Sequence, residues 1–169
     1  MLKKPYILTS IIIITLSLFV FSYYKESKSQ ETDRDEAYYN QKGLSHFNEG
    51  FYRLMPKGKR EEALQRYGQA IAEFKKAIRI NEGHVEAHLN LARVYYVQKN
   101  FSEAAEKYKQ ATELTPYDID IYVKLASAYA RINRFSEAIE QLEKAKTFTG
   151  EAVVINQLND LIRKLEQVK

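Results

Sequence analysis

Histidines are the side chains of this sequence that come closest to a catalytic or metal-binding arrangement. Only three are present, and two of them, His84 and His88, lie four residues apart. On one helix this spacing would turn both imidazoles to the same face, as in a two-histidine metal site. Catalytic zinc requires three protein ligands, and no third candidate lies nearby in the sequence. We therefore expect no metal and no cofactor, with His88 acting as a packing residue.

Other constellations that support catalysis are missing from the sequence. The chain has no cysteine, which excludes disulfides, cysteine-ligated zinc and a lipid-modified N-terminal cysteine. It also has no glycine-rich phosphate loop, no nucleophile with an adjacent base and no motif of paired carboxylates. Pairs such as Glu73 with Lys76 are typical of solvated helix faces. We expect that the protein is not an enzyme.

The distribution of charge argues against a nucleic-acid partner. The formal net charge is +4, and two of the basic residues, Lys3 and Lys4, stand at the N-terminus. The rest of the chain is nearly balanced, so it lacks the basic patch that binds a phosphate backbone. A protein partner fits this composition better.

An internal repeat dominates the middle of the chain. Residues 85–118 are followed at once by residues 119–152, which carry the same apolar and small residues at the same spacing. A fixed period of this length indicates stacked helix pairs, none of which can bury its apolar face alone. The matching positions include Leu91 with Leu125, Ala92 with Ala126, Tyr95 with Tyr129, Phe101 with Phe135, Ala104 with Ala138 and Ala111 with Ala145.

These residues resemble the tetratricopeptide repeat, in which small residues mark the points where two antiparallel helices approach closely. His88 stands where the first signature aromatic is usual. The resemblance implies an all-α fold, an α-solenoid of about three antiparallel helix pairs followed by a C-terminal capping helix. The unit 85–118 matches the pattern at Leu91, Ala92, Tyr95, Ala104, Tyr108, Ala111 and Pro116.

The repeat domain is expected to occupy residues 36–169, with an irregular first repeat over 36–84. Gly43 takes the close-approach position there, and 48–50 and 55–59 interrupt the helical pattern. The first repeat is about 15 residues longer than the others, and we expect a loop plus a longer second helix. A tolerated extension is favoured over a functional insertion. Residues 153–168 form the expected cap helix, with one apolar and one polar face.

An apolar segment, residues 1–24, precedes a polar linker at 25–35. Its uncharged run from Pro5 to Tyr24 could form a transmembrane helix that crosses a bilayer about 30 Å thick. We favour an uncleaved anchor. The alternative is a cleaved signal segment, which would leave a secreted protein, although the best cleavage site, Val20-Phe21-Ser22, is crowded by aromatics. Lys3 and Lys4 favour a cytoplasmic N-terminus and a repeat domain on the periplasmic side of a bacterial envelope.

The resemblance implies a function in binding. In the family, the first helix of each pair lines a concave face, where we expect a peptide or helix of a protein partner to bind. The protein would then be a membrane-anchored, non-catalytic adaptor or scaffold. The alternative is a homo-oligomeric assembly factor of an envelope complex that uses the first repeat or the cap helix as its interface. The residues expected on this predicted face are Asn40, Leu44, Phe47, Leu89, Asn90, Arg93, Tyr96, Val97, Val123, Lys124, Ser127 and Arg131.

Some members of the family hold the C-terminal tails of heat-shock chaperones with a clamp of lysine, asparagine and arginine. This chain matches the clamp at Asn90 and offers Lys124 in place of its arginine. It departs from the pattern at Asn40, Leu44 and Asp120, and an acidic residue at 120 would repel a carboxylate. We expect the clamp to be absent.

Overall fold

The computed structural model describes Val20 and residues 35–168. The chain divides into two units, Met1–Asp35 and Glu36–Lys169, and the second unit contains the repeats. The predicted anchor at 1–24 and linker at 25–35 lie outside the described residues, apart from Val20 and Asp35. Among the described residues, no helix is long and apolar enough to cross a membrane.

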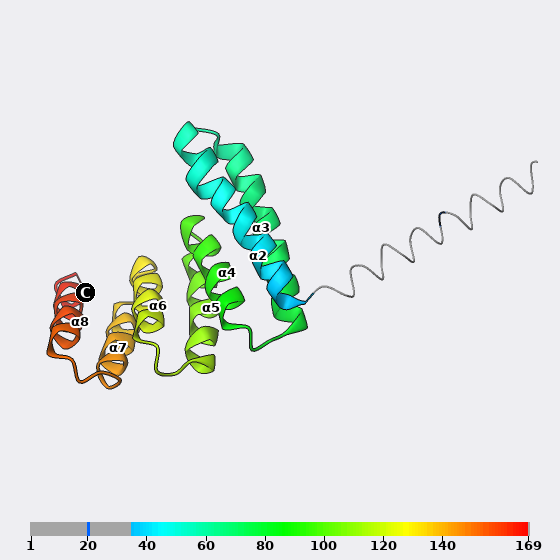
Figure 1. Cartoon of the computed structure of the whole chain (residues 1–169). Coiled ribbons are helices and arrows are strands. Elements are labelled where there is room, and N and C mark those ends of the chain that lie inside the picture. The colour runs from blue at the N-terminus through cyan, green and yellow to red at the C-terminus, as the bar shows by residue number, and fades with distance from the viewer. Residues whose placement is uncertain (1–19, 21–34, 169) are drawn as a thin grey trace, which may run out of the picture. The chain divides into compact units, whose positions relative to one another are not determined.

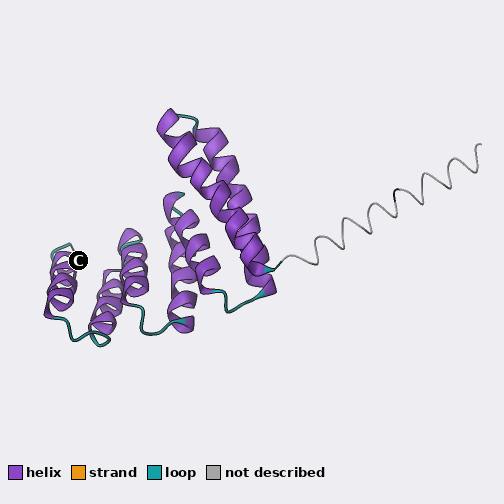
Figure 2. Cartoon of the chain, viewed as in Figure 1, coloured by secondary structure: helices purple, strands orange, loops and turns teal. Residues whose placement is uncertain are grey.

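Helices stacked in sequence order form the second unit, and residues 36–168 contain no strand (Figures 1 and 2). Three antiparallel pairs follow one another and a single helix ends the stack, so the predicted all-helical solenoid is confirmed. The pairs are α2 (Glu36–Asn48) with α3 (Arg60–Ile80), α4 (Val85–Val97) with α5 (Phe101–Leu114), and α6 (Ile119–Arg131) with α7 (Phe135–Lys146), and the last helix is α8 (Ala152–Glu166).

The turns inside the second and third pairs share one backbone geometry. Lys99 and Asn133 both adopt left-handed conformations, with φ of 65° and 60°. Immediately after them, the N–H groups of Asn100 and Arg134 donate to the carbonyls of Tyr95 and Tyr129, at 2.9 and 3.0 Å. These bonds satisfy carbonyls that the ending helix leaves free. Equivalent positions in two repeats therefore make the same tight turn.

Side chains cap the first helices of the second and third pairs. Asp118 accepts a hydrogen bond from the backbone N–H of Asp120 at 3.0 Å, as its position before α6 predicts. His84 precedes α4, and its Nδ1 accepts from the N–H of Ala87 at 3.3 Å. Each cap satisfies one of the backbone donors that a helix start leaves unpaired. The caps fix where the helices of the candidate binding surface begin.

Small residues lie at the points of closest helix approach. Ala92, Ala104 and Ala111 are completely buried. In the first pair Gly43 takes this role, because a Cβ built there would lie 2.6 Å from Cε1 of Phe74. The small size of the residues at these positions lets the large rings pack beside the opposing backbone.

The extension of the first repeat differs from the expected loop. The chain does not leave the helix at residues 48–50 but continues as a π-helix, η1 (Glu49–Leu54), and a short 3₁₀ turn, η2 (Met55–Lys57). Gly58, with φ of 70°, then reverses the chain into α3. The extra residues therefore lengthen both helices of the pair, which is visibly longer than the others in Figure 1.

Packing explains why the helix continues. The ring of Phe47 stacks on Phe51 at 5.4 Å and on Tyr67 of α3 at 5.8 Å between centroids. Gly50 leaves room for Tyr67, whose ring carbon would lie 2.8 Å from an added Cβ. Burial of these rings offsets the weak helix propensity of residues 48–50.

The two ends of the stack are closed in different ways. At the C-terminal end, Leu158 and Ile162 of α8 are buried in the core of the last repeats. On the first pair, an ion pair joins α2 and α3, in which Lys42 is bound to the largely buried Glu73 at 3.0 Å.

Two glycines of the first pair give opposite expectations for substitution. Gly43→Ala should lower the free energy of unfolding by about 1–2 kcal/mol, because the clash with Phe74 outweighs the gain in helix propensity. Gly68→Ala, in α3, should raise it by about 0.5–1 kcal/mol, since nothing lies within 4 Å of its added Cβ. Denaturant unfolding followed by circular dichroism measures both. Equal effects of the two variants would contradict the close approach at Gly43.

Candidate functional site

The predicted face is formed by α2, α4 and α6, the first helices of the three pairs. Arg93, Ser127 and Arg131 are exposed on it. Asn40 and Phe47 are buried. The remaining residues of the face are partly exposed, and these are Leu44, Leu89, Asn90, Tyr96, Val97, Val123 and Lys124.

Two residues of the prediction are therefore not available to a partner. Asn40 is 5% exposed, and its amide is held between Glu86 at 3.4 Å and Asn90 at 3.0 Å. Phe47 is 1% exposed because the longer helix pair encloses its ring. The guanidinium of Arg93 lies over this ring at 4.8 Å. Phe47 supports the surface from below and does not form part of it.

Hydrogen bonds across the face join successive helix pairs. Arg93 of α4 donates to the hydroxyl of Tyr52 in η1 at 2.9 Å. The hydroxyls of Tyr96 in α4 and Ser127 in α6 lie 2.9 Å apart. These side chains link the first pair to the second and the second to the third, so the exposed groups form one continuous surface.

The charge of the surface comes from three basic residues. Arg93 lies over Phe47, and Arg131 lies over the ring of Phe101 at 4.7 Å. Within residues 35–168, neither arginine has a carboxylate within 4.0 Å. Lys124 is paired with Asp120. The two arginines are thus available to acidic groups of a partner.

The environment of Lys124 reduces its affinity for a proton. Burial lowers the pKa of this lysine, Asp118 opposes the change, and the nearby Arg93 lowers the pKa further. The field of Arg93 therefore reaches across the face to α6. Like charges that interact in this way favour a nearby anionic group.

An apolar hollow of about 270 Å³ adjoins the C-terminal end of the face. Val123 and Ala126 of α6, Leu142 of α7 and Leu161 of α8 line it, and Lys164 stands at its edge. Leu161 is 37% exposed, although the pattern of the cap helix assigned it to the covered face. The hollow has the size to accept one apolar side chain.

Sequence reasoning missed Tyr52, Leu161, Lys164 and Leu165 at this surface. Tyr52 belongs to the extension, and the others belong to α8, so none falls in the repeated first helix from which the face was predicted. No signal for α8 was present in the sequence, because its apolar residues Val154, Leu158, Leu161, Ile162 and Leu165 lie within one stripe about 100° wide, the usual width of a covered helix face.

The histidines have structural contacts. His84 caps α4, and the Nε2 atom of His88 lies 2.9 Å from the carbonyl oxygen of Glu82. His88 is 5% exposed, in the packing position predicted for it. Within residues 35–168, no three histidine, aspartate or glutamate side chains gather closely enough to hold a metal.

The residues that match the chaperone-tail clamp are engaged inside the protein. Asn90 donates to Asn40, and Lys124 is paired with Asp120. Leu44 supplies no donor at its position. The groups that would hold a terminal carboxylate therefore already have partners or are replaced.

Comparison with protein families identifies the repeats. Two models of the tetratricopeptide repeat match the chain, one at residues 55–119 and the other at 98–148. Together they span more than half of the 169 residues. The chain therefore belongs to the tetratricopeptide-repeat family. No curated protein matches it.

Solved structures share the fold. The first repeat domain of Spaghetti (RPAP3), bound to the HSP90 peptide SRMEEVD, is 20% identical, with a TM-score of 0.55 over 76% of this chain and 94% of the other. The TPR2B domain of yeast Sti1, in complex with a pHsp70 component, is 19% identical, with a TM-score of 0.56 over 76% and 99%. The thermophilic protein TTC0263 of Thermus thermophilus is 26% identical, with a TM-score of 0.54 over 64% of this chain and 54% of its own.

Tyr108 lies behind the surface and gives an expected pH dependence. Burial and, to a smaller extent, Tyr96 raise the pKa of its hydroxyl against the opposing effect of Arg93, to about 12. In the unfolded chain the same pKa is about 10, so folding is favoured below pH 10 and this contribution is lost as the pH rises towards 12. From pH 10 to pH 12, the free energy of unfolding should therefore fall by about 2–3 kcal/mol less in Tyr108→Phe than in the unsubstituted protein.

Urea unfolding between pH 9 and 12 measures this effect. The control is Tyr117→Phe, because the Tyr117 side chain is 78% exposed. The same alkaline loss in Tyr108→Phe and in the unsubstituted protein would show that the hydroxyl of Tyr108 is not responsible.

Proposed function

We propose that the protein is a non-catalytic adaptor that binds a peptide or helix of a partner protein on the predicted face. The observation that carries the proposal is the continuous surface of α2, α4 and α6. It presents Arg93 and Arg131 without carboxylate partners beside an apolar hollow. A segment with an acidic group and one apolar anchor would complement both features.

The related structures support binding as the general role. Two of them are complexes with a chaperone component, an HSP90 peptide in one and pHsp70 in the other. At about 20% identity this likeness extends to the fold alone. The partner of this chain is proposed to differ, because Lys124 and Asn90 are engaged with Asp120 and Asn40.

Charge reversal on the face tests the proposal. In Arg93→Glu/Arg131→Glu, crosslinking to a partner in the native cell should fall about tenfold or more, because both substitutions place carboxylates where acidic groups would bind. Quantitative mass spectrometry of the crosslinked species measures this. The matched control is Lys75→Glu/Lys109→Glu, which makes the same change of charge on exposed residues of α3 and α5.

The pattern of capture distinguishes the alternatives. Loss in the face variant and retention in the control support the adaptor. An unchanged set of captured proteins would contradict binding at this face. Capture of only a second copy of the chain would favour the homo-oligomeric assembly factor.

We also propose that residues 1–24 anchor the protein in a membrane, with the repeats on the periplasmic side of a bacterial envelope. The support is the uncharged run from Pro5 to Tyr24 preceded by Lys3 and Lys4. The full-length protein should then remain with membranes after carbonate extraction and be digested by protease added to spheroplasts. Release of a shortened chain into the supernatant would instead indicate a cleaved signal.

A further inference from the structure

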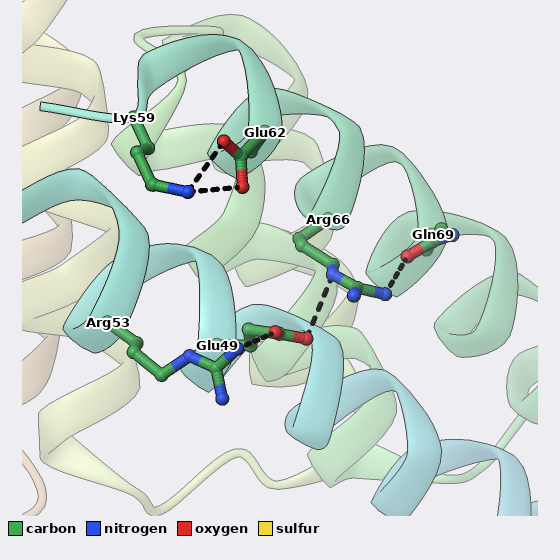
Figure 3. A network of polar contacts seen from close by, with 6 residues as sticks. All are labelled: Glu49, Arg53, Lys59, Glu62, Arg66 and Gln69. Atoms are coloured by element: carbon green, nitrogen blue, oxygen red, sulfur yellow. Dashed lines mark hydrogen bonds and ion pairs between the residues drawn. The ribbon is translucent and has the colours of Figure 1, made fainter. Parts of the chain in front are cut away.

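The extended part of the first helix pair contains a polar cavity of about 450 Å³. Figure 3 shows six of the polar residues that line it. It is lined only by residues between 49 and 69, which belong to η1, η2, the turn at Gly58 and the first half of α3. No residue of α4 to α8 contributes to it. The cavity therefore shares no residue with the predicted face.

Positive charge exceeds negative charge in this cavity by two. Its lining contains Arg53, Lys57, Lys59 and Arg66 against Glu49 and Glu62. Both carboxylates are already bound, as the dashed lines of Figure 3 show. The pairs are Arg53 Nη2 to Glu49 at 2.7 Å, Arg66 Nε to Glu49 at 2.8 Å and Lys59 Nζ to Glu62 at 2.9 Å.

Several donors remain after these pairs are counted. Arg53 uses one nitrogen, Nη2, on Glu49. Arg66 uses Nε on Glu49 and Nη1 on Gln69, at 2.9 Å, which leaves Nη2. Lys57 makes no side-chain hydrogen bond or ion pair with any residue that the structure describes. Both arginines and Lys57 are lining residues of the same cavity, so it has donors that no described residue uses.

We propose that this cavity is a binding site for a phosphate group. A doubly charged phosphate would balance the excess of two positive charges, and guanidinium groups bind phosphate oxygens through paired hydrogen bonds. The volume lies within the range of small-ligand sites. The π-helix η1, which places Glu49 and Arg53 on the cavity wall, is a rare conformation found frequently at functional sites. The phosphate can belong to a free anion or to a lipid headgroup.

Glu62 limits the affinity of the site. Both of its carboxylate oxygens accept from Lys59, at 2.9 and 3.2 Å, so the charge of this ammonium group is already partly neutralised. Neutralising Glu62 would release Lys59 and remove one negative charge from the wall. Phosphate binding should then become stronger, a gain that a merely structural role of Glu62 would not produce.

Isothermal titration calorimetry of the full-length protein in a non-ionic detergent tests the site. One arm uses inorganic phosphate and the other a water-soluble short-chain phosphatidic acid, whose phosphate monoester also approaches two negative charges near neutral pH. Arg53→Gln/Lys57→Gln should weaken binding about tenfold or more, and Glu62→Gln should strengthen it several-fold. The control, Lys75→Gln/Lys109→Gln, loses the same charge outside the cavity and should bind within about twofold of the unsubstituted protein.

The two arms identify the source of the phosphate. Binding of inorganic phosphate alone indicates a free anion, and binding of the phosphatidic acid alone indicates a headgroup, provided that Arg53→Gln/Lys57→Gln loses this binding. No binding in either arm at millimolar concentration would overturn the proposal. So would equal weakening in the cavity variant and the control, because it would show that only the overall charge matters.

Discussion

Close approach of helix backbones is the constraint on which the rest of this structure depends. Ala92, Ala104 and Ala111 are completely buried, and Gly43 takes the same role where the ring of Phe74 leaves no room for a methyl group. Where the helix backbones touch at these points, the large side chains beside them fill the remaining space between the helices. The first helices of successive pairs are thereby held side by side, so that their exposed residues form a single surface.

The regular part of the fold could be predicted from the sequence because its signals are local and repeated. The 34-residue period locates the second and third pairs, and Asp118 marks a helix start by its own side chain. The extension could not be predicted in the same way. Asn48-Glu49-Gly50 is typical of a turn, yet stacking of Phe47 on Phe51 and Tyr67 keeps it helical. Contacts with a distant helix decide this segment, and they override local propensity.

For the candidate surface, the sequence predicts which helix faces take part, but not how their side chains contact one another. Periodicity indicates that Phe47 and Arg93 lie on one side of their helices, but not that one covers the other. Nor does periodicity indicate that Asn90 donates to Asn40 within the protein, because this bond depends on the separation of helices from different repeats. The pair of Lys124 with Asp120, by contrast, follows from their spacing of four residues on one helix. Tyr52 and Leu161 were missed for the related reason that they enter from irregular elements at the two ends of the stack.

The extension of the first pair connects two surfaces of different character. Tyr52 and Arg53 are adjacent in the chain, but Tyr52 bonds to Arg93 of the predicted face while Arg53 bonds to Glu49 in the polar cavity. Adjacent residues of a helical segment point in different directions, so this short π-helix can supply both. A loop of the same length would not hold these two directions fixed. The helical form of the extension is therefore what allows it to enlarge the predicted face and form a separate cavity at once.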